Sequence, residues 1–157
     1  MVRVFFQWMN DLPFSKALGA SVWQFATIQA LHLVALAVFA GAVLIVDLRL
    51  MGVGVKERPI SDVARDAQPW LIWGFIALTV TGIPQMMQNA IREYFSFFFW
   101  LKMGFLLVAL IFTATVRRTV TLAGDGVGAL RAKVVGLVSI VLWAGVAIPA
   151  RLIGLFS

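Results

Sequence analysis

Three ionisable side chains lie inside long apolar runs of this 157-residue sequence: His32, Lys102 and Arg151. A Lys or Arg at the centre of a membrane span costs roughly 2.5–3.5 kcal/mol on insertion scales, so an intramembrane ionisable residue points to function. A neutral imidazole can ligate a metal ion, and cations can bind the carboxylates of an anionic ligand. These three residues therefore suggest a cofactor site inside a membrane.

The composition excludes an ordinary soluble protein. Hydrophobic residues make up 62% of the chain and charged residues 13%, against about 45–50% and about 25% in soluble domains. The absence of cysteine excludes disulfides and thiolate metal sites. The net charge of +6 comes from basic residues between apolar runs, where they act as topology signals, so we expect no nucleic-acid partner.

Four segments are long and apolar enough to cross the roughly 30 Å hydrocarbon core as helices. They run over about residues 22–46, 70–88, 97–116 and 134–156, and none alternates as a membrane β-strand would. The sequence predicts an all-α fold: one membrane domain over residues 1–157, built as a bundle of four transmembrane helices. Aromatic and polar residues mix before Pro13, which predicts a short interfacial segment with a bend there, the alternative being a frayed tail.

Basic residues are divided unevenly between the two ends of the spans. Eight lie in segments 48–69 and 117–133, and four lie on the other side. Because basic loops stay in the cytoplasm, we expect both segments to be cytoplasmic and both termini to lie outside. His32 then lies about 15 Å into the first span, near mid-membrane. Lys102 and Arg151 lie in the outer half.

The second span carries a polar stripe at the same depth. Thr81, Gln85 and Gln88 are spaced i, i+4, i+7, which places them on one helix face. All four spans thus present polar groups at mid-depth or in the outer half, which favours a common site.

These residues fit a pocket for heme b in the outer half of the bundle, with a redox or electron-transfer role. His32 would ligate the iron, and Lys102 and Arg151 would bind the two propionates. Gln85 and Gln29 are further candidates for cofactor contacts. A quinone or another redox partner is the expected electron partner.

The number of histidines leaves two questions open. Because His32 is the only histidine, the sixth iron position is open, or is filled by Met86, Met87, Met103, Lys102 or a partner subunit. One histidine with several methionines also suits Cu(I), so copper handling is the alternative function.

Three readings without a cofactor remain. Lys102 and Arg151 can extend to the interface, His32 can simply bond to Gln29, and the chain can be a non-catalytic subunit of a homo-oligomer packed through small residues. No acidic residue lies in the outer halves of the spans to neutralise the two cations. Glu93 can fold back to pair with one of them, but it is expected to pair with its neighbour Arg92 in water. An exogenous anion is therefore expected as counter-charge.

Four short motifs carry a resemblance that covers essentially the whole chain. They are LHLVALAVFAGAVLIVDLRLMG, TGIPQ, FFFWLK and ARLIG. The sequence resembles small bacterial four-helix membrane proteins of unknown function and is more distantly similar to the membrane protoporphyrinogen oxidase and copper-resistance D families. The resemblance implies a multi-pass protein of the bacterial inner membrane. By analogy with the oxidase, His32 matches a heme-ligand histidine and Lys102 a functional lysine.

Overall fold

The structure, a computed structural model, describes residues 1–156, without the side chains of residues 14, 17–19 and 154–156. No strand occurs in the described residues, which confirms the all-α fold. The elements in chain order are α1 (Val2–Asp11), α2 (Pro13–Ala20), α3 (Val22–Leu50), α4 (Ile60–Gln88), α5 (Ala90–Phe95), α6 (Phe97–Phe112), the π-helical turn η1 (Thr113–Arg117), α7 (Arg118–Ala123), the 3₁₀ turn η2 (Gly124–Gly126) and α8 (Ala129–Phe156).

Four helical stretches are long and apolar enough to cross a membrane, so the chain is a multi-pass membrane protein. They are Val22–Leu50, Ile60–Gln88, Phe97–Gly126 and Ala129–Ile153. The helices extend beyond the predicted spans, so the two connections at the basic end shrink to residues 51–59 and 124–128. The hydropathy pattern predicts only the part of each helix that lies in the hydrocarbon core. The helices are longer because their backbone hydrogen bonds continue into the headgroup region.

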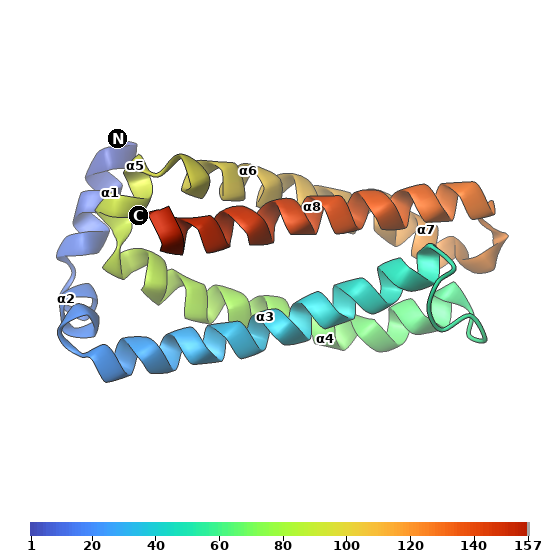
Figure 1. Cartoon of the computed structure of the whole chain (residues 1–157), viewed down its shortest axis with the longest axis horizontal. Helices are drawn as coiled ribbons and strands as arrows, with labels where there is room; N and C mark the ends of the chain where they lie inside the picture. Colours follow the sequence, from blue (N-terminus) through green and yellow to red (C-terminus); the bar gives the residue numbers. More distant parts are fainter. Residues whose placement is uncertain (157) are drawn as a thin grey trace.

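The N-terminal segment is docked across one end of the bundle, so the alternative of a frayed tail is wrong (Figure 1). Pro13 starts α2 and marks the predicted bend, because proline fits the first turn of a helix. Phe6 and Met9 of α1 are buried in an apolar cluster with residues of α5 and α6. The Ser15 hydroxyl donates to the Met87 carbonyl at 2.9 Å.

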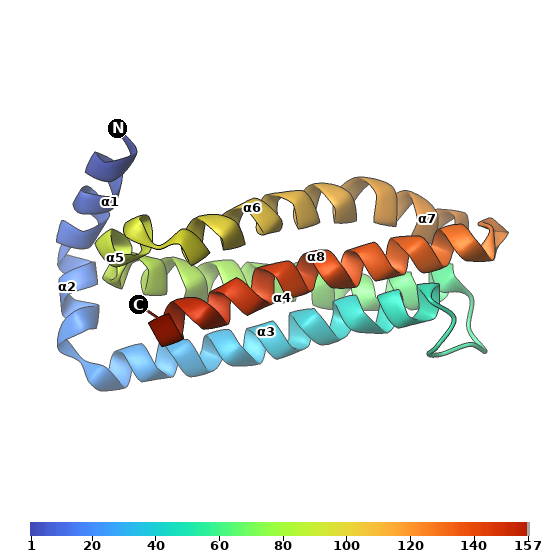
Figure 2. The same cartoon turned by 45° about the horizontal axis from the view of Figure 1, so that its top comes forward.

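The long helices form two pairs, α3 with α4 and α6 with α8 (Figure 2). Both termini lie at one end of the bundle, and the two short connections lie at the other (Figure 1). We call the end that carries residues 51–59 and 124–128 the loop end, and the other the terminal end. The even number of crossings places both termini on the same side of the membrane.

The two pairs are joined by a hydrophobic core at the loop end. Its buried members are Val46, Leu50, Ile60, Val63, Ala67, Val120, Ala132 and Val135. Gly136 of α8 lets that helix approach α3 closely, since a Cβ there would lie 2.8 Å from the Asp47 carbonyl oxygen. No larger residue fits without moving one backbone away from the other.

A buried ion pair crosses the same contact. The Arg117 Nε donates to Asp47 Oδ1 at 2.8 Å, and its Nη2 donates to the Val43 carbonyl at 3.2 Å. The side chains are only 0% (Asp47) and 5% (Arg117) exposed. The prediction that Arg117 lies in a cytoplasmic loop is therefore wrong. Helix α6 continues through η1, and its π-helical turn ends at Arg117, where the side chain reaches α3.

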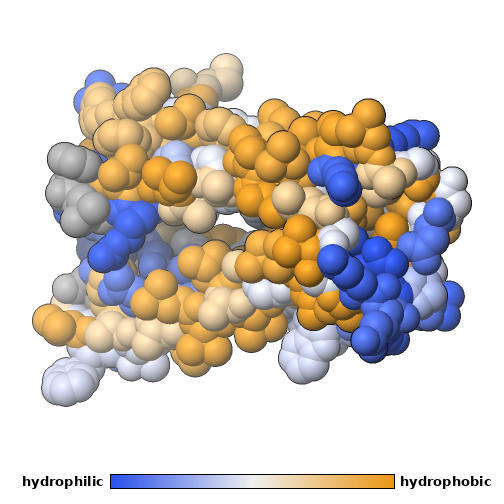
Figure 3. Space-filling view, turned by 45° about the vertical axis from the view of Figure 1, so that its right-hand side comes forward, coloured by the Kyte–Doolittle hydropathy of each residue, from blue (hydrophilic) through white to orange (hydrophobic). Residues whose placement is uncertain are grey.

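Away from this contact the two pairs separate. Figure 3 shows the surface hollowed between the two layers of helices, with hydrophilic side chains beside the hollow. Trp143 of α8 and Phe39 of α3 meet edge to face at 4.8 Å between ring centroids, and this contact lies between the ion pair and His32 along α3. The space toward the terminal end is where the candidate site lies.

Breaking the ion pair should destabilise the bundle strongly. Asp47→Asn or Arg117→Met alone leaves one buried charge without its partner, so we expect each to lower the free energy of unfolding by about 3–5 kcal/mol. The double variant should lose less than the sum of the two. Lys16→Met removes the exposed ion pair with Asp11, whose side chains are 65% and 70% exposed, and should change stability by at most about 1 kcal/mol. Unfolding in bicelles measures all four; additive losses would contradict direct pairing.

Candidate functional site

His32 of α3 is hydrogen-bonded across the helix pair to Thr81 of α4. Its Nδ1 lies 2.8 Å from the Thr81 Oγ1. The Thr81 hydroxyl donates its own proton to the Ala77 carbonyl at 2.7 Å, so toward His32 it can only accept. With the hydroxyl proton assigned to the Ala77 carbonyl, the imidazole proton lies on Nδ1 and Nε2 carries the lone pair.

Gly82 makes room for the imidazole ring. A Cβ at this position would lie 3.2 Å from the His32 Cε1, so a larger residue would press on the ring. Gln29 has an exposed side chain. The prediction that His32 bonds to Gln29 is wrong, because the imidazole ring faces α4 and hydrogen-bonds to Thr81.

The polar stripe of α4 continues from Thr81 toward the terminal end. The Gln85 Nε2 donates to the Thr81 carbonyl at 3.1 Å, which leaves the Gln85 side-chain oxygen as an acceptor. Pro84 lies inside the helix and has no N–H for the Val80 carbonyl. The buried Oε1 of Gln88 has no hydrogen-bond partner among the described residues. Polar groups therefore remain available along this face.

Lys102 of α6 lies between an acidic and an aromatic neighbour. Its Nζ lies 5.2 Å from the centroid of the Phe99 ring, within cation–π range. Its charge acts on both His32 and Glu93. The charge of Lys102 therefore reaches His32, while their sharing of one site stays a prediction.

Glu93 is not the water-exposed partner of Arg92 that we expected. Its Oε2 is buried, whereas the Arg92 side chain is exposed. Burial raises the pKa of Glu93, and the opposing effect of the Lys102 charge is the smaller one. Helix α5 explains the difference, because residues 90–95 form a helical turn that places Glu93 inside the terminal end rather than in an outer loop.

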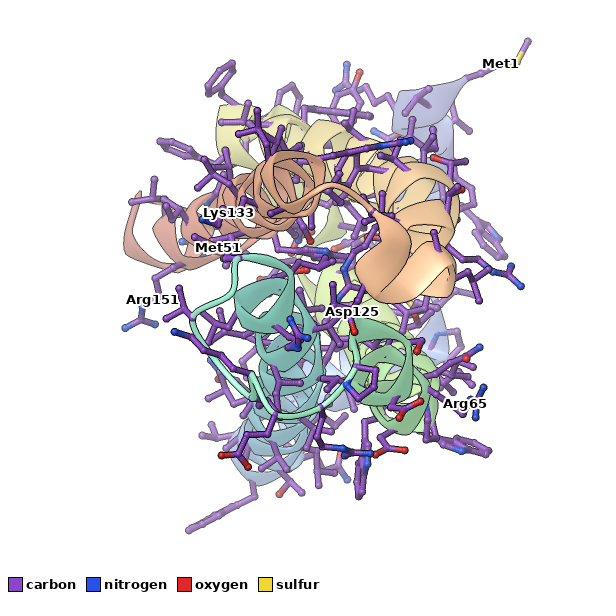
Figure 4. All side chains as sticks on the ribbon, turned by 90° about the vertical axis from the view of Figure 1, so that its right-hand side faces the viewer. Met1, Met51, Arg65, Asp125, Lys133 and Arg151 are labelled. Atoms are coloured by element: carbon purple, nitrogen blue, oxygen red, sulfur yellow. The ribbon has the colours of Figure 1, made fainter. Side chains whose placement is uncertain are left out.

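Arg151 lies apart from these residues. Its side chain is exposed and projects away from the bundle in Figure 4. The methionines considered as ligands are dispersed too, since Met86 and Met87 pack against the α1 cluster and Met103 is exposed. Within residues 1–156, no three or more His, Asp or Glu side chains gather in a way that could hold a metal ion alone.

Comparison with known proteins identifies a family whose function is unknown. The chain matches the model of a family of unknown function, DUF6644, over residues 5–157. No curated protein and no solved structure matches it. The match covers the four long helices and the whole candidate site, and the more distant similarity to heme and copper families stays an expectation from the motifs.

Ionisation of Glu93 should make the protein less stable as the pH rises. A raised native pKa means that the folded state holds this proton more tightly than the unfolded chain. Stability should therefore fall from about pH 4.3, the ordinary glutamate pKa, through the native pKa, and then level off. Glu93→Gln has no such proton, so its stability relative to wild type should increase over that interval.

Unfolding titrations of wild type and Glu93→Gln measure this difference. Glu57→Gln is the matched control, because Glu57 is exposed in the 51–59 connection, and it should follow wild type at each pH. Parallel curves for wild type and Glu93→Gln would contradict the burial of this carboxyl group.

Proposed function

The chain belongs to this family of unknown function, and we propose that it binds heme b between its two helix pairs and transfers electrons. His32 would hold the heme iron through Nε2. The site would lie in the terminal half of the bundle, between α3 and α4 on one side and α6 and α8 on the other.

The observation that carries the proposal is the hydrogen bond between the His32 Nδ1 and the Thr81 Oγ1. A ligating histidine usually donates its other N–H to a fixed acceptor, which orients the ring and makes the ligating nitrogen more basic. Thr81 supplies that acceptor at 2.8 Å, held in turn by its bond to the Ala77 carbonyl. Within the described residues, Nε2 makes no hydrogen bond, so its lone pair is available to iron.

A porphyrin explains how one histidine suffices. The macrocycle supplies four nitrogen ligands, so the protein needs to add only one. A site built from side chains alone needs several ligands, and the described part of the chain contains no group of three or more His, Asp or Glu side chains that could form one. Because the methionines lie elsewhere or face outward, we propose that the sixth position stays open to an exogenous ligand.

Lys102 is the proposed partner of a heme propionate. It is half-buried, and Glu93 is the acidic side chain that acts on its charge. A propionate would supply further counter-charge to Lys102. Gln85 and Gln88 would offer amide groups to the second propionate.

Bound heme b would supply a one-electron couple. The chain would orient the porphyrin plane through His32 and shield it from water with Phe39 and Trp143. A quinone or a protein redox partner would exchange the electron. Seven basic residues remain at the loop end once the buried Arg117 is set aside, against four at the terminal end. This excess supports a bacterial inner-membrane protein with both termini in the periplasm.

The reduced-minus-oxidised absorbance spectrum tests the proposal. Protein from cells supplied with a heme precursor should show Soret and α bands, and carbon monoxide should shift the Soret band of the reduced form. His32→Ala should lose the bands, because the axial ligand is gone. Thr81→Val should weaken heme retention about 10–100-fold, because His32 loses the hydrogen-bond partner that orients its ring. Thr79→Val is the matched control, since Thr79 is exposed and bonds only within its own helix.

The same preparations test the two cations separately. Lys102→Met should lower heme occupancy and shift the reduction potential, because a propionate loses its partner. Arg151→Met should leave both unchanged, since Arg151 faces away from the site. Equal losses in the two variants would contradict this assignment.

Two results would overturn the proposal. One is an absence of heme bands in wild-type protein even after growth with excess precursor. The other is a stoichiometric content of copper that His32→Ala removes, which would favour copper handling instead.

A further inference from the structure

A second candidate site lies outside the bundle, on the opposite half from His32. A groove of about 430 Å³ runs between α3 and α4 at the loop end and is closed there by residues of the 51–59 connection. This connection crosses the end of the helix pair below Met51 in Figure 4. A volume of this size is in the range of small-molecule pockets, about 300–1,000 Å³.

The walls of the groove are apolar and lipid-facing. Ala37, Gly41 and Ile45 line it from α3, and Trp70 lines it from α4. All four are exposed, and they lie in helices that cross the membrane. A Cβ added at Gly41 would meet no atom within 4 Å. Because a void forfeits dispersion contacts, the groove in a bilayer must hold an acyl chain or another apolar group.

The mouth of the groove carries an ordered pair of opposite charges. The Arg58 Nη1 lies 2.7 Å from Asp66 Oδ2, and the two side chains are about half exposed. The Arg58 backbone is held in place, since its carbonyl accepts from Arg49 Nε at 2.6 Å. Arg49 in turn bonds to Asp125 at 3.0 Å. A fixed cation and a fixed anion thus stand side by side where the groove meets the headgroup region.

We propose that this groove binds one phospholipid with a primary-amine zwitterionic headgroup, of the phosphatidylethanolamine class. Its acyl chain would lie along Ala37, Gly41 and Ile45. Its phosphate would bind the remaining guanidinium N–H groups of Arg58, and its ammonium would donate to Asp66. The site is independent of the proposed heme pocket.

The charges at the mouth distinguish this lipid from other occupants. Asp66 repels a purely anionic headgroup such as that of phosphatidylglycerol. A trimethylated amine, as in phosphatidylcholine, has no N–H to donate to a carboxylate. A second copy of the chain would have to desolvate the Arg58–Asp66 pair, which is costly without further partners.

Native mass spectrometry of the whole protein, released from nanodiscs of equal phosphatidylethanolamine, phosphatidylglycerol and phosphatidylcholine, tests the proposal. One phosphatidylethanolamine should stay bound to the wild-type monomer in at least several-fold excess over the other two lipids. Asp66→Asn should remove that excess in favour of phosphatidylglycerol. Retention in proportion to the lipid mixture would overturn the proposal.

A variant with a side chain that fills the groove distinguishes lipid binding at this site from nonspecific lipid adhesion to the protein. Gly41→Leu should lose the retained lipid. Gly104→Leu is the matched control, because Gly104 of α6 is also exposed with nothing within 4 Å of an added Cβ, and it should keep the lipid. Equal retention in both variants would overturn the site. A wild-type dimer that Gly41→Leu converts to a monomer would show that a second copy occupies the groove instead.

Discussion

The buried ion pair between Asp47 and Arg117 is the interaction on which the arrangement of the bundle depends. Lipid surrounds the long helices, so the hydrophobic effect favours a helix neighbour little over lipid, and close packing and polar contacts decide which helices meet. The pair joins α3 to η1, and thereby one helix pair to the other, at the loop end. Gly136 allows the close backbone approach that accompanies it.

The two helix pairs are joined at the loop end, so the terminal end is free to hold a cofactor. The two helix pairs diverge beyond the contact of Phe39 with Trp143, and hydrophilic side chains lie beside the hollow between them (Figure 3). α1 and α2 cross that end, where Ser15 bonds to the Met87 carbonyl. A bundle packed tightly along its whole length would have no room for a porphyrin. The proposed cofactor would thus occupy space that the fold leaves open.

The sequence predicted what depends on local pattern. Hydropathy and length identified the four helices, and the spacing of Thr81, Gln85 and Gln88 identified a polar face. Counting residues along the two spans predicted that His32 and Lys102 lie at mid-depth and in the outer half, and this placement in the membrane stays a prediction. The bend at Pro13 followed from the conformational limits of proline.

Contacts between distant segments could not be predicted in this way. Arg117 has the same side chain as the exposed Arg118 beside it, and only the π-helical turn and the position of α3 distinguish them. Glu93 looked like a loop residue because the helical turn of α5 is too short to give a periodic signal. Gln29 and Arg151 belong to the right spans but face away from the site, and a single sequence without its packing partners does not fix which face turns inward.

We infer that the bundle is closed at the loop end and open at the terminal end, where we propose that heme binds. Because the chain has no cysteine, two cysteines can be introduced in one variant and each can carry a spin label, with no labelling at other positions. Distances between the two labels would be measured in Val22→Cys/Phe97→Cys at the terminal end and in Leu44→Cys/Leu122→Cys at the loop end. Each variant would be measured without heme and with heme in its diamagnetic ferrous carbon-monoxide form. We expect a broad distribution at the terminal end that narrows with heme, and a narrow one at the loop end that does not change. Distributions of equal width at both ends, unaffected by heme, would contradict the account.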